Sequence, residues 1–199
     1  LHDRWDDWQD VHNKDIKYNF LCMNGQPKPH REKLYDLLKD QKTGYCTHGY
    51  KNPVPFALYS DYNWNNVTNF INLMPLYQQS KTSIVSETIY ADHPGIISEK
   101  TLLAIAAKHP FMCIGQINIH KQIADRGFEN FDELFNLSYD ELDKTQRLDA
   151  AIELNLSYLT DAAAHEKAER NFDFLMNDYT ASIELHAKKQ LHAITGRSY

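Results

Sequence analysis

The sequence lacks the glycine-rich and nucleophile-centred signatures that mark many enzymes. No GxGxxG, Walker phosphate loop, GxSxG elbow or HExxH pair occurs among its 199 residues. Positive charge is also scarce, because 21 Lys and Arg residues face 27 Asp and Glu residues, which gives a net charge of −6. This balance disfavours nucleic-acid binding by a general basic face, but it is compatible with one local anion pocket.

Cysteine is limited to Cys22, Cys46 and Cys113, and no apolar run is long enough to span a membrane. An odd number of widely spaced cysteines favours buried thiols over a disulfide framework or a zinc site. We therefore expect a cytoplasmic protein in which Cys22 and Cys113 are buried and form no disulfide. The histidines of the C-terminal tail do not share a helix face at ligand distance, so we predict no metal site.

A hydrophobic content of 42% is enough for the core of one domain. Residues 1–16 are acidic and aromatic without a clean period, which suggests a linker or docking segment. Regular patterns begin at residue 17, so we place one α/β domain at 17–160. Apolar residues at helical spacing over 162–194 indicate a long C-terminal helix, and we assign 161–199 to a helical tail.

Within the domain, the chain repeats the order strand, turn, helix. An apolar strand lies in 17–23, and Pro29 suits the first turn of the helix that follows, in which Leu34, Leu37 and Leu38 share one face. Residues 43–80 are rich in Tyr, Asn and Pro, and little regular structure is predicted there.

The second unit starts with a strand at 83–86 and continues, after a short loop, with a helix that cannot pass His109 because Pro110 follows. A short buried strand then ends at Gly115. The sequence predicts two further helices before the tail, one after residue 116 and one from Gln146 to Leu159.

Both of the first helices carry a cation in the first turn, where backbone N–H groups and the helix dipole favour anions. Arg31 heads the first helix, and Ser98, Glu99 and Lys100 form the N-cap, N1 and N2 positions of the second. Because both helices follow parallel strands, we expect Arg31 and Lys100 to converge at one sheet edge, within about 15 Å. The plainer alternative is that both cations are solvated surface charges.

Glu87 follows the strand at 83–86 and precedes the loop to the second helix. A carboxylate at this place faces the expected ligand crevice and can accept a hydrogen bond from a ribose or sugar hydroxyl. The alternative is that Glu87 caps the backbone of the loop or pairs with Lys100.

Four stretches of the sequence follow one another in an order similar to that of a known protein family: "FLCMNGQPKPHREKLYDLL", "GYCTHGYKN", "SIVSETIYADHPGIISEKTLLAIAAKHPFMCIGQINIHKQI" and "GFENFDEL". This order resembles the C-terminal, donor-binding half of the α-1,3-fucosyltransferase-like glycosyltransferases over roughly residues 17–136. The Glu-Lys pair with its helix is the most specific part. The family has Asn where this chain has Thr88, and Thr where it has Ser98.

The resemblance implies that Arg31 and Lys100 hold the diphosphate of a nucleotide sugar, and that Ser98 keeps the N-cap hydroxyl of the donor helix. It also implies that Glu99 contacts the ribose or the sugar and that Glu87 lies on the donor-sugar side. No cofactor is implied beyond the donor substrate, for which a GDP-sugar is one option.

We therefore expect an α/β, Rossmann-like three-layer domain with a mainly parallel sheet and a long C-terminal helix. The resemblance makes it half of a GT-B type fold. The expected activity is transfer of a sugar from a nucleotide diphosphate sugar to a glycan or another acceptor. The alternative is a non-catalytic binding or structural module that lost the acceptor domain. A homo-oligomer that builds its acceptor site across subunits is a further option.

Overall fold

The computed structural model describes residues 12, 14–49, 51, 73–160 and 166–184. Within them, the chain forms a four-stranded sheet in the order β2-β1-β3-β4, and every pair of neighbouring strands is parallel. The strands are β1 (Tyr18–Cys22), β2 (Gly44–Cys46), β3 (Ser80–Ser86) and β4 (Phe111–Ile114). The prediction of an α/β fold with a parallel sheet is confirmed.

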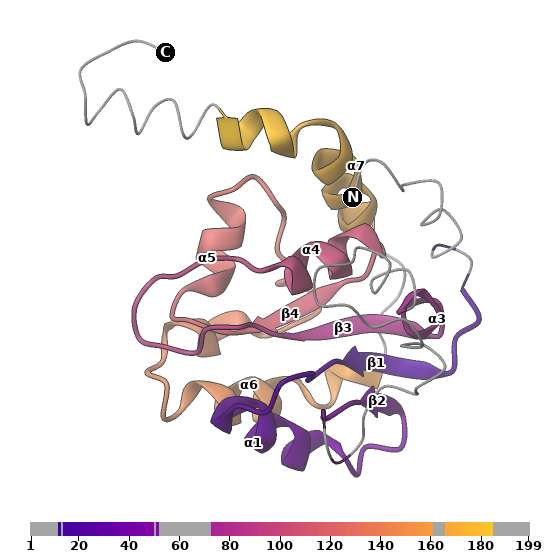
Figure 1. Ribbon diagram of the computed structural model, residues 1–199, viewed down its shortest axis with the longest axis vertical. Helices are drawn as coiled ribbons and strands as arrows, with labels where there is room; N and C mark the ends of the chain where they lie inside the picture. Colours follow the sequence, from indigo (N-terminus) through magenta and orange to yellow (C-terminus); the bar gives the residue numbers. More distant parts are fainter. Residues whose placement is uncertain (1–11, 13, 50, 52–72, 161–165, 185–199) are drawn as a thin grey trace.

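Helices cover both faces of the sheet, with α1 and α6 on one face and α4 and α7 on the other (Figure 1). This arrangement gives the three layers of a Rossmann-like domain. The helices are α1 (Pro29–Leu38), α3 (Met74–Gln78), α4 (Glu99–Ala106), α5 (Ile119–Ala124), α6 (Arg147–Asn155) and α7 (Glu166–Asn177), and the 3-10 turns are η3 (Leu137–Glu141) and η4 (Tyr158–Thr160). No described helix is long and apolar enough to cross a membrane.

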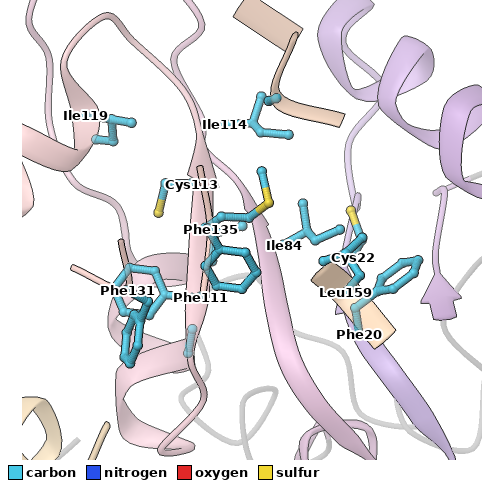
Figure 2. Close-up of a cluster of buried hydrophobic side chains, with 14 of the residues drawn as sticks. Phe20, Cys22, Ile84, Phe111, Cys113, Ile114, Ile119, Phe131, Phe135 and Leu159 are labelled. Atoms are coloured by element: carbon cyan, nitrogen blue, oxygen red, sulfur yellow. The ribbon is translucent and has the colours of Figure 1, made fainter. Parts of the chain in front are cut away.

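Two apolar clusters hold the layers together. Side chains alternate along β1, so that Phe20 and Cys22 join the larger cluster while Leu21 joins the smaller one on the other face. The larger cluster is rich in aromatic rings; those of Phe111 and Phe131, for example, pack edge to face with their centroids 5.2 Å apart (Figure 2). The expectation that Cys22 and Cys113 are buried is confirmed, and both carry free thiols in the structure.

The segment expected to hold little regular structure contains two short elements. Gly44–Cys46 forms β2 at the edge of the sheet, and Met74–Gln78 forms α3. Three residues are too few to show a strand period, so only pairing with β1 reveals β2. Residues 52–72 of this segment lie outside the described part of the chain.

Two details of the helix predictions are wrong. Leu34 and Leu38 are buried, but Leu37 is 38% exposed, so the three leucines do not share a buried face. The tail does not form one continuous helix either, because α7 ends at Asn177 and a turn at Asp178 precedes the helical residues 179–184. Residues 161–165 and 185–199 lie outside the described residues.

The described end of the 1–16 segment contacts the carboxyl end of α4. Lys14 Nζ donates to the carbonyl oxygen of Ala107 at 3.0 Å, and His12 Nε2 lies 3.1 Å from that of Ala106. These contacts satisfy carbonyl groups that a helix leaves without partners at its end.

Candidate functional site

The carboxyl ends of β1 and β3 meet at one edge of the sheet, since the two strands are parallel neighbours. From this edge the chain enters α1 after β1, and it enters a loop, residues 87–98, after β3. This loop leads directly into α4. The amino ends of α1 and α4 therefore both follow strands that end at the edge where open α/β sheets bind ligands.

The start of α4 has the predicted geometry. Ser98 is the N-cap, and its side chain accepts a hydrogen bond from the backbone N–H of Lys100 at 3.4 Å. Glu99 and Lys100 are the first two residues of the helix. The hydrogen bond satisfies one of the N–H groups that a helix leaves unpaired at its start.

Two ammonium groups approach the same residue of the loop from different helices. Lys100 Nζ donates to Thr88 Oγ1 at 3.2 Å, and Lys28 Nζ donates to the carbonyl oxygen of Thr88 at 2.7 Å. Lys28 is the N-cap residue of α1. Thr88 is thus held between cations from the amino ends of α1 and α4.

Arg31 lies beneath this loop and is 3% exposed, so it is not a solvated surface charge. Its Nη2 donates to the carbonyl oxygens of Ser86 and Glu87, both at 3.2 Å, and its Nη1 donates to that of Gln26 at 3.3 Å. Its buried Nε has no partner in the structure. The guanidinium therefore ties the end of β3 to the turn before α1.

Glu87 is completely buried, and its carboxylate binds the loop that follows it. The oxygens accept hydrogen bonds from the backbone N–H groups of Thr88 and Ser98, each at 3.2 Å, and from Thr101 Oγ1 at 2.6 Å. Of the two alternatives for Glu87, capping of the loop backbone is the one that the structure contains.

Burial and charge set the protonation of the groups around the site. Burial lowers the pKa of Arg31, while the negative charges of Glu87 and Glu99 oppose that shift. Burial raises the pKa of Glu99, but the contact with Lys100, a backbone hydrogen bond and the charge of Arg31 act together in the opposite direction, so that the pKa of this carboxyl is lowered overall. Burial lowers the pKa of His30 to about 4, so this imidazole is neutral at pH 7.

The 87–98 loop is also fixed from the β4 side by Arg147, which is fully buried. Arg147 Nη1 donates to the carbonyl oxygens of Ala91 at 3.0 Å and Gly115 at 2.8 Å. Its Nη2 contacts the Asp92 carboxylate at 2.7 Å. The loop is thus held at its start by Arg31 and at its middle by Arg147, which keeps Thr88 in a defined place.

The structure brings Arg31 and Lys100 together at the end of β3. Each cation contacts an oxygen of the adjacent residues Glu87 and Thr88 at 3.2 Å. Since covalent geometry limits the separation of those two oxygens to about 5 Å, the charged groups are no more than about 12 Å apart. Lys100 also borders a small pocket on the α3 and α4 side, whose lining includes Met23 and Tyr77.

The sequence interpretation missed Lys28 and did not foresee the role of Thr88. Lys28 immediately precedes Pro29, the residue expected in the first turn of the helix. The sequence therefore indicated a cation at the start of this helix at Lys28 as clearly as at Arg31. Thr88 carried no signal, because its contacts depend on how the loop folds between two helices.

No group of three His, Cys, Asp or Glu side chains that could hold a metal ion occurs among the described residues. The chain matches no protein-family model, no curated protein and no solved structure at a significant level.

Proposed function

We propose that the chain binds the diphosphate of a nucleotide sugar at the carboxyl end of β3 and acts in glycosyl transfer. The observation that carries this proposal is the approach of Lys28 and Lys100 to Thr88 from the amino ends of α1 and α4. Two ammonium groups and two helix N-termini near one point favour a multivalent anion. The resemblance to the fucosyltransferase-like pattern supports a sugar nucleotide as its source.

The present partners of the two lysines are weaker acceptors than a phosphate. Lys28 donates to a neutral carbonyl group, while Lys100 contacts a neutral hydroxyl group and the carboxylate of Glu99, which is 52% exposed. Charge-assisted bonds to phosphate oxygens are stronger than bonds to neutral oxygens. A diphosphate would therefore displace these contacts without breaking the core of the domain.

The other predicted residues take different parts in this proposal. Arg31 supplies positive charge from below and holds the end of β3, because its Nη atoms already bind backbone carbonyl groups. Glu87 and Ser98 hold the loop and the start of α4. Glu99 is partly exposed, and in this proposal it would accept a hydrogen bond from a ribose or sugar hydroxyl.

In glycosyl transfer, the bond between the sugar and the diphosphate breaks, and negative charge grows on the leaving diphosphate. Lys28, Lys100 and the backbone N–H groups of α4 would stabilise that charge more strongly in the transition state than in the bound donor. Their positions are set before binding by the capped helix and by the fixed loop. This preorganisation is what lets fixed charges lower a reaction barrier.

The second candidate is a binding or structural module without catalysis. It is favoured by Arg31 and Glu87, whose hydrogen bonds are made within the chain itself. This candidate shares the anion site with the first but predicts no turnover of a sugar nucleotide.

Calorimetric titration with GDP, UDP, CDP and dTDP tests the proposal. We expect one nucleoside diphosphate to bind, and Lys100→Ala or Lys28→Ala to weaken it by about 1.5–3 kcal/mol, which corresponds to roughly 10- to 150-fold. Lys39→Ala, at the exposed opposite end of α1, is the matched control and should leave affinity unchanged. Folding stability should barely change in Lys100→Ala, because Ala has the better helix propensity.

Absence of binding to all four nucleotides, or equal affinity in the Lys100→Ala variant and its parent, would reject the site. Binding without release of nucleoside diphosphate from any sugar nucleotide, with glycan acceptors present, would favour the non-catalytic module.

A further inference from the structure

Two of the three cysteines lie side by side on neighbouring strands. Cys22 is the last residue of β1, Cys46 is the last residue of β2, and the two are direct register partners in the parallel sheet. Both side chains belong to the same apolar cluster beneath α1, where Cys22 packs near Phe20 and Leu159 (Figure 2). The pair therefore faces one side of the sheet.

The two sulfurs are close enough to share a hydrogen-bond donor. Asn24 Nδ2 lies 3.4 Å from Cys22 Sγ and 3.8 Å from Cys46 Sγ. The register pairing and the shared Asn24 amide place the two thiol groups close together on one face of the sheet. The neighbouring Cys46 thiol, followed by burial, raises the pKa of the Cys22 thiol well above its usual range. The positive charge of Arg31 acts in the opposite direction on Cys22.

We propose that Cys22 and Cys46 form a dithiol site that a low-molecular-weight disulfide, such as glutathione disulfide, converts reversibly into an intramolecular disulfide. Neighbouring strands lie about 4.8 Å apart, and disulfides join Cα atoms that are about 4.4–6.8 Å apart. Register partners on one face thus need only a small adjustment to bond. This inference is independent of nucleotide binding.

The reaction begins at Cys46, which is 7% exposed and lies on the edge strand, whereas Cys22 is 0% exposed. The Cys46 thiol loses a proton to solvent, and its thiolate attacks one sulfur of the small disulfide and releases one thiolate. Cys22 Sγ then attacks Cys46 Sγ of the mixed disulfide; the bond from Cys46 to the small thiol breaks, and the proton of the Cys22 thiol passes to the departing sulfur, so that the second small thiol is released. The protein dithiol is oxidised by two electrons, and the small disulfide is reduced to two thiols.

The new bond would close a covalent loop around the segment that contains α1. That segment carries Lys28 and Arg31 at the carboxyl edge of the sheet. Oxidation would therefore restrict the separation of β1 and β2 beneath the helix that presents those cations. Cys113 is excluded from the pair because it lies on β4, with β3 between it and β1, and its thiol contacts Thr101 Oγ1 at 3.3 Å.

The test treats the full chain, under native conditions, with glutathione disulfide, blocks remaining thiols with N-ethylmaleimide and maps the peptides by mass spectrometry. We expect a Cys22–Cys46 linkage, an alkylated Cys113, and return of all three thiols after dithiothreitol. Cys113→Ser is the matched control and should give the same linkage. Three alkylated cysteines, a linkage that includes Cys113, or a lasting glutathione adduct on Cys46 would each overturn the proposal.

Cys22→Ser should instead accumulate the glutathione adduct on Cys46, since the resolving thiol is gone. Should this variant not fold, phenylarsine oxide on the unaltered protein provides the second measurement. One equivalent should protect two of the three thiols from alkylation, because trivalent arsenic bridges close thiol pairs. Protection of none would contradict the proposal.

Discussion

Replacement of Glu87 by Gln measures how strongly the buried carboxylate holds the loop that carries Thr88. Glu87 is fully buried, and its oxygens accept from two backbone N–H groups and from the Thr101 hydroxyl. In the best arrangement, the Gln amide nitrogen donates to Thr101 Oγ1 while its oxygen accepts from the N–H groups of Thr88 and Ser98. The contacts then survive, but the charge that strengthens them is lost.

A hydrogen bond to a charged group contributes about 1.5–3 kcal/mol and one to a neutral group about 0.5–1.5 kcal/mol. A loss of about 1–1.5 kcal/mol of charge assistance on each of three bonds predicts destabilisation by about 3–4.5 kcal/mol, and the loss of a nearby negative charge for buried Arg31 acts in the same direction. For a chain of this size, that corresponds to a fall in melting temperature of about 6–18 °C.

The assay is urea unfolding followed by far-ultraviolet circular dichroism, with comparison of midpoints at equal slope. Glu153→Gln removes the same charge at an exposed position of α6 and should change stability by less than about 0.5 kcal/mol. If Glu87→Gln is as stable as this control, the carboxylate does not hold the loop, and its role lies with a ligand instead.

Three further predictions concern the core, the loop and the pH response. In urea unfolding, Leu34→Ala should lower the free energy of unfolding by about 2–5 kcal/mol and Leu37→Ala by less than about 1 kcal/mol, since Leu34 is 0% and Leu37 is 38% exposed. Equal losses of stability in the two variants would contradict the observed packing of α1. Arg147→Lys should lower the free energy of unfolding by about 2–4 kcal/mol in the same assay, because one ammonium group cannot reach all the carbonyl oxygens and the carboxylate that the guanidinium contacts. Unchanged stability would mean that Arg147 is not needed to hold the 87–98 loop. Burial lowers the pKa of His109 well below its usual 6.5. Below about pH 6.5 the unfolded chain therefore binds a proton at His109 that the folded chain does not bind, and the folded state loses stability as the pH falls. Urea midpoints measured between pH 7.5 and 5 should fall more steeply in the parent than in His109→Gln; equal slopes would show that His109 does not cause the loss of stability.

Local sequence determined the elements whose signals are short-range. Ser98 and the residues after it specify the start of α4 by themselves, because the N-cap hydrogen bond joins residues two apart. Pro110 sets a local limit on the helical segment, since its ring restricts His109, but α4 already ends at Ala106, and Lys108 takes a left-handed φ of 52°. The apolar runs of β1 and β4 likewise predicted buried strands, and the repeated strand and helix order predicted the parallel sheet.

The tertiary structure alone decided which partner each side chain found. A long side chain such as Arg31 or Lys28 reaches groups that are close in space but more than fifty residues away in the sequence, and the order of residues carries no measure of that distance. The partnership of Cys22 with Cys46 depends in the same way on strand register, which pairing across the sheet sets. The sequence therefore determined that cations stand at the amino ends of two helices, and the packing of those helices on one sheet decided that Lys28 and Lys100 meet at Thr88.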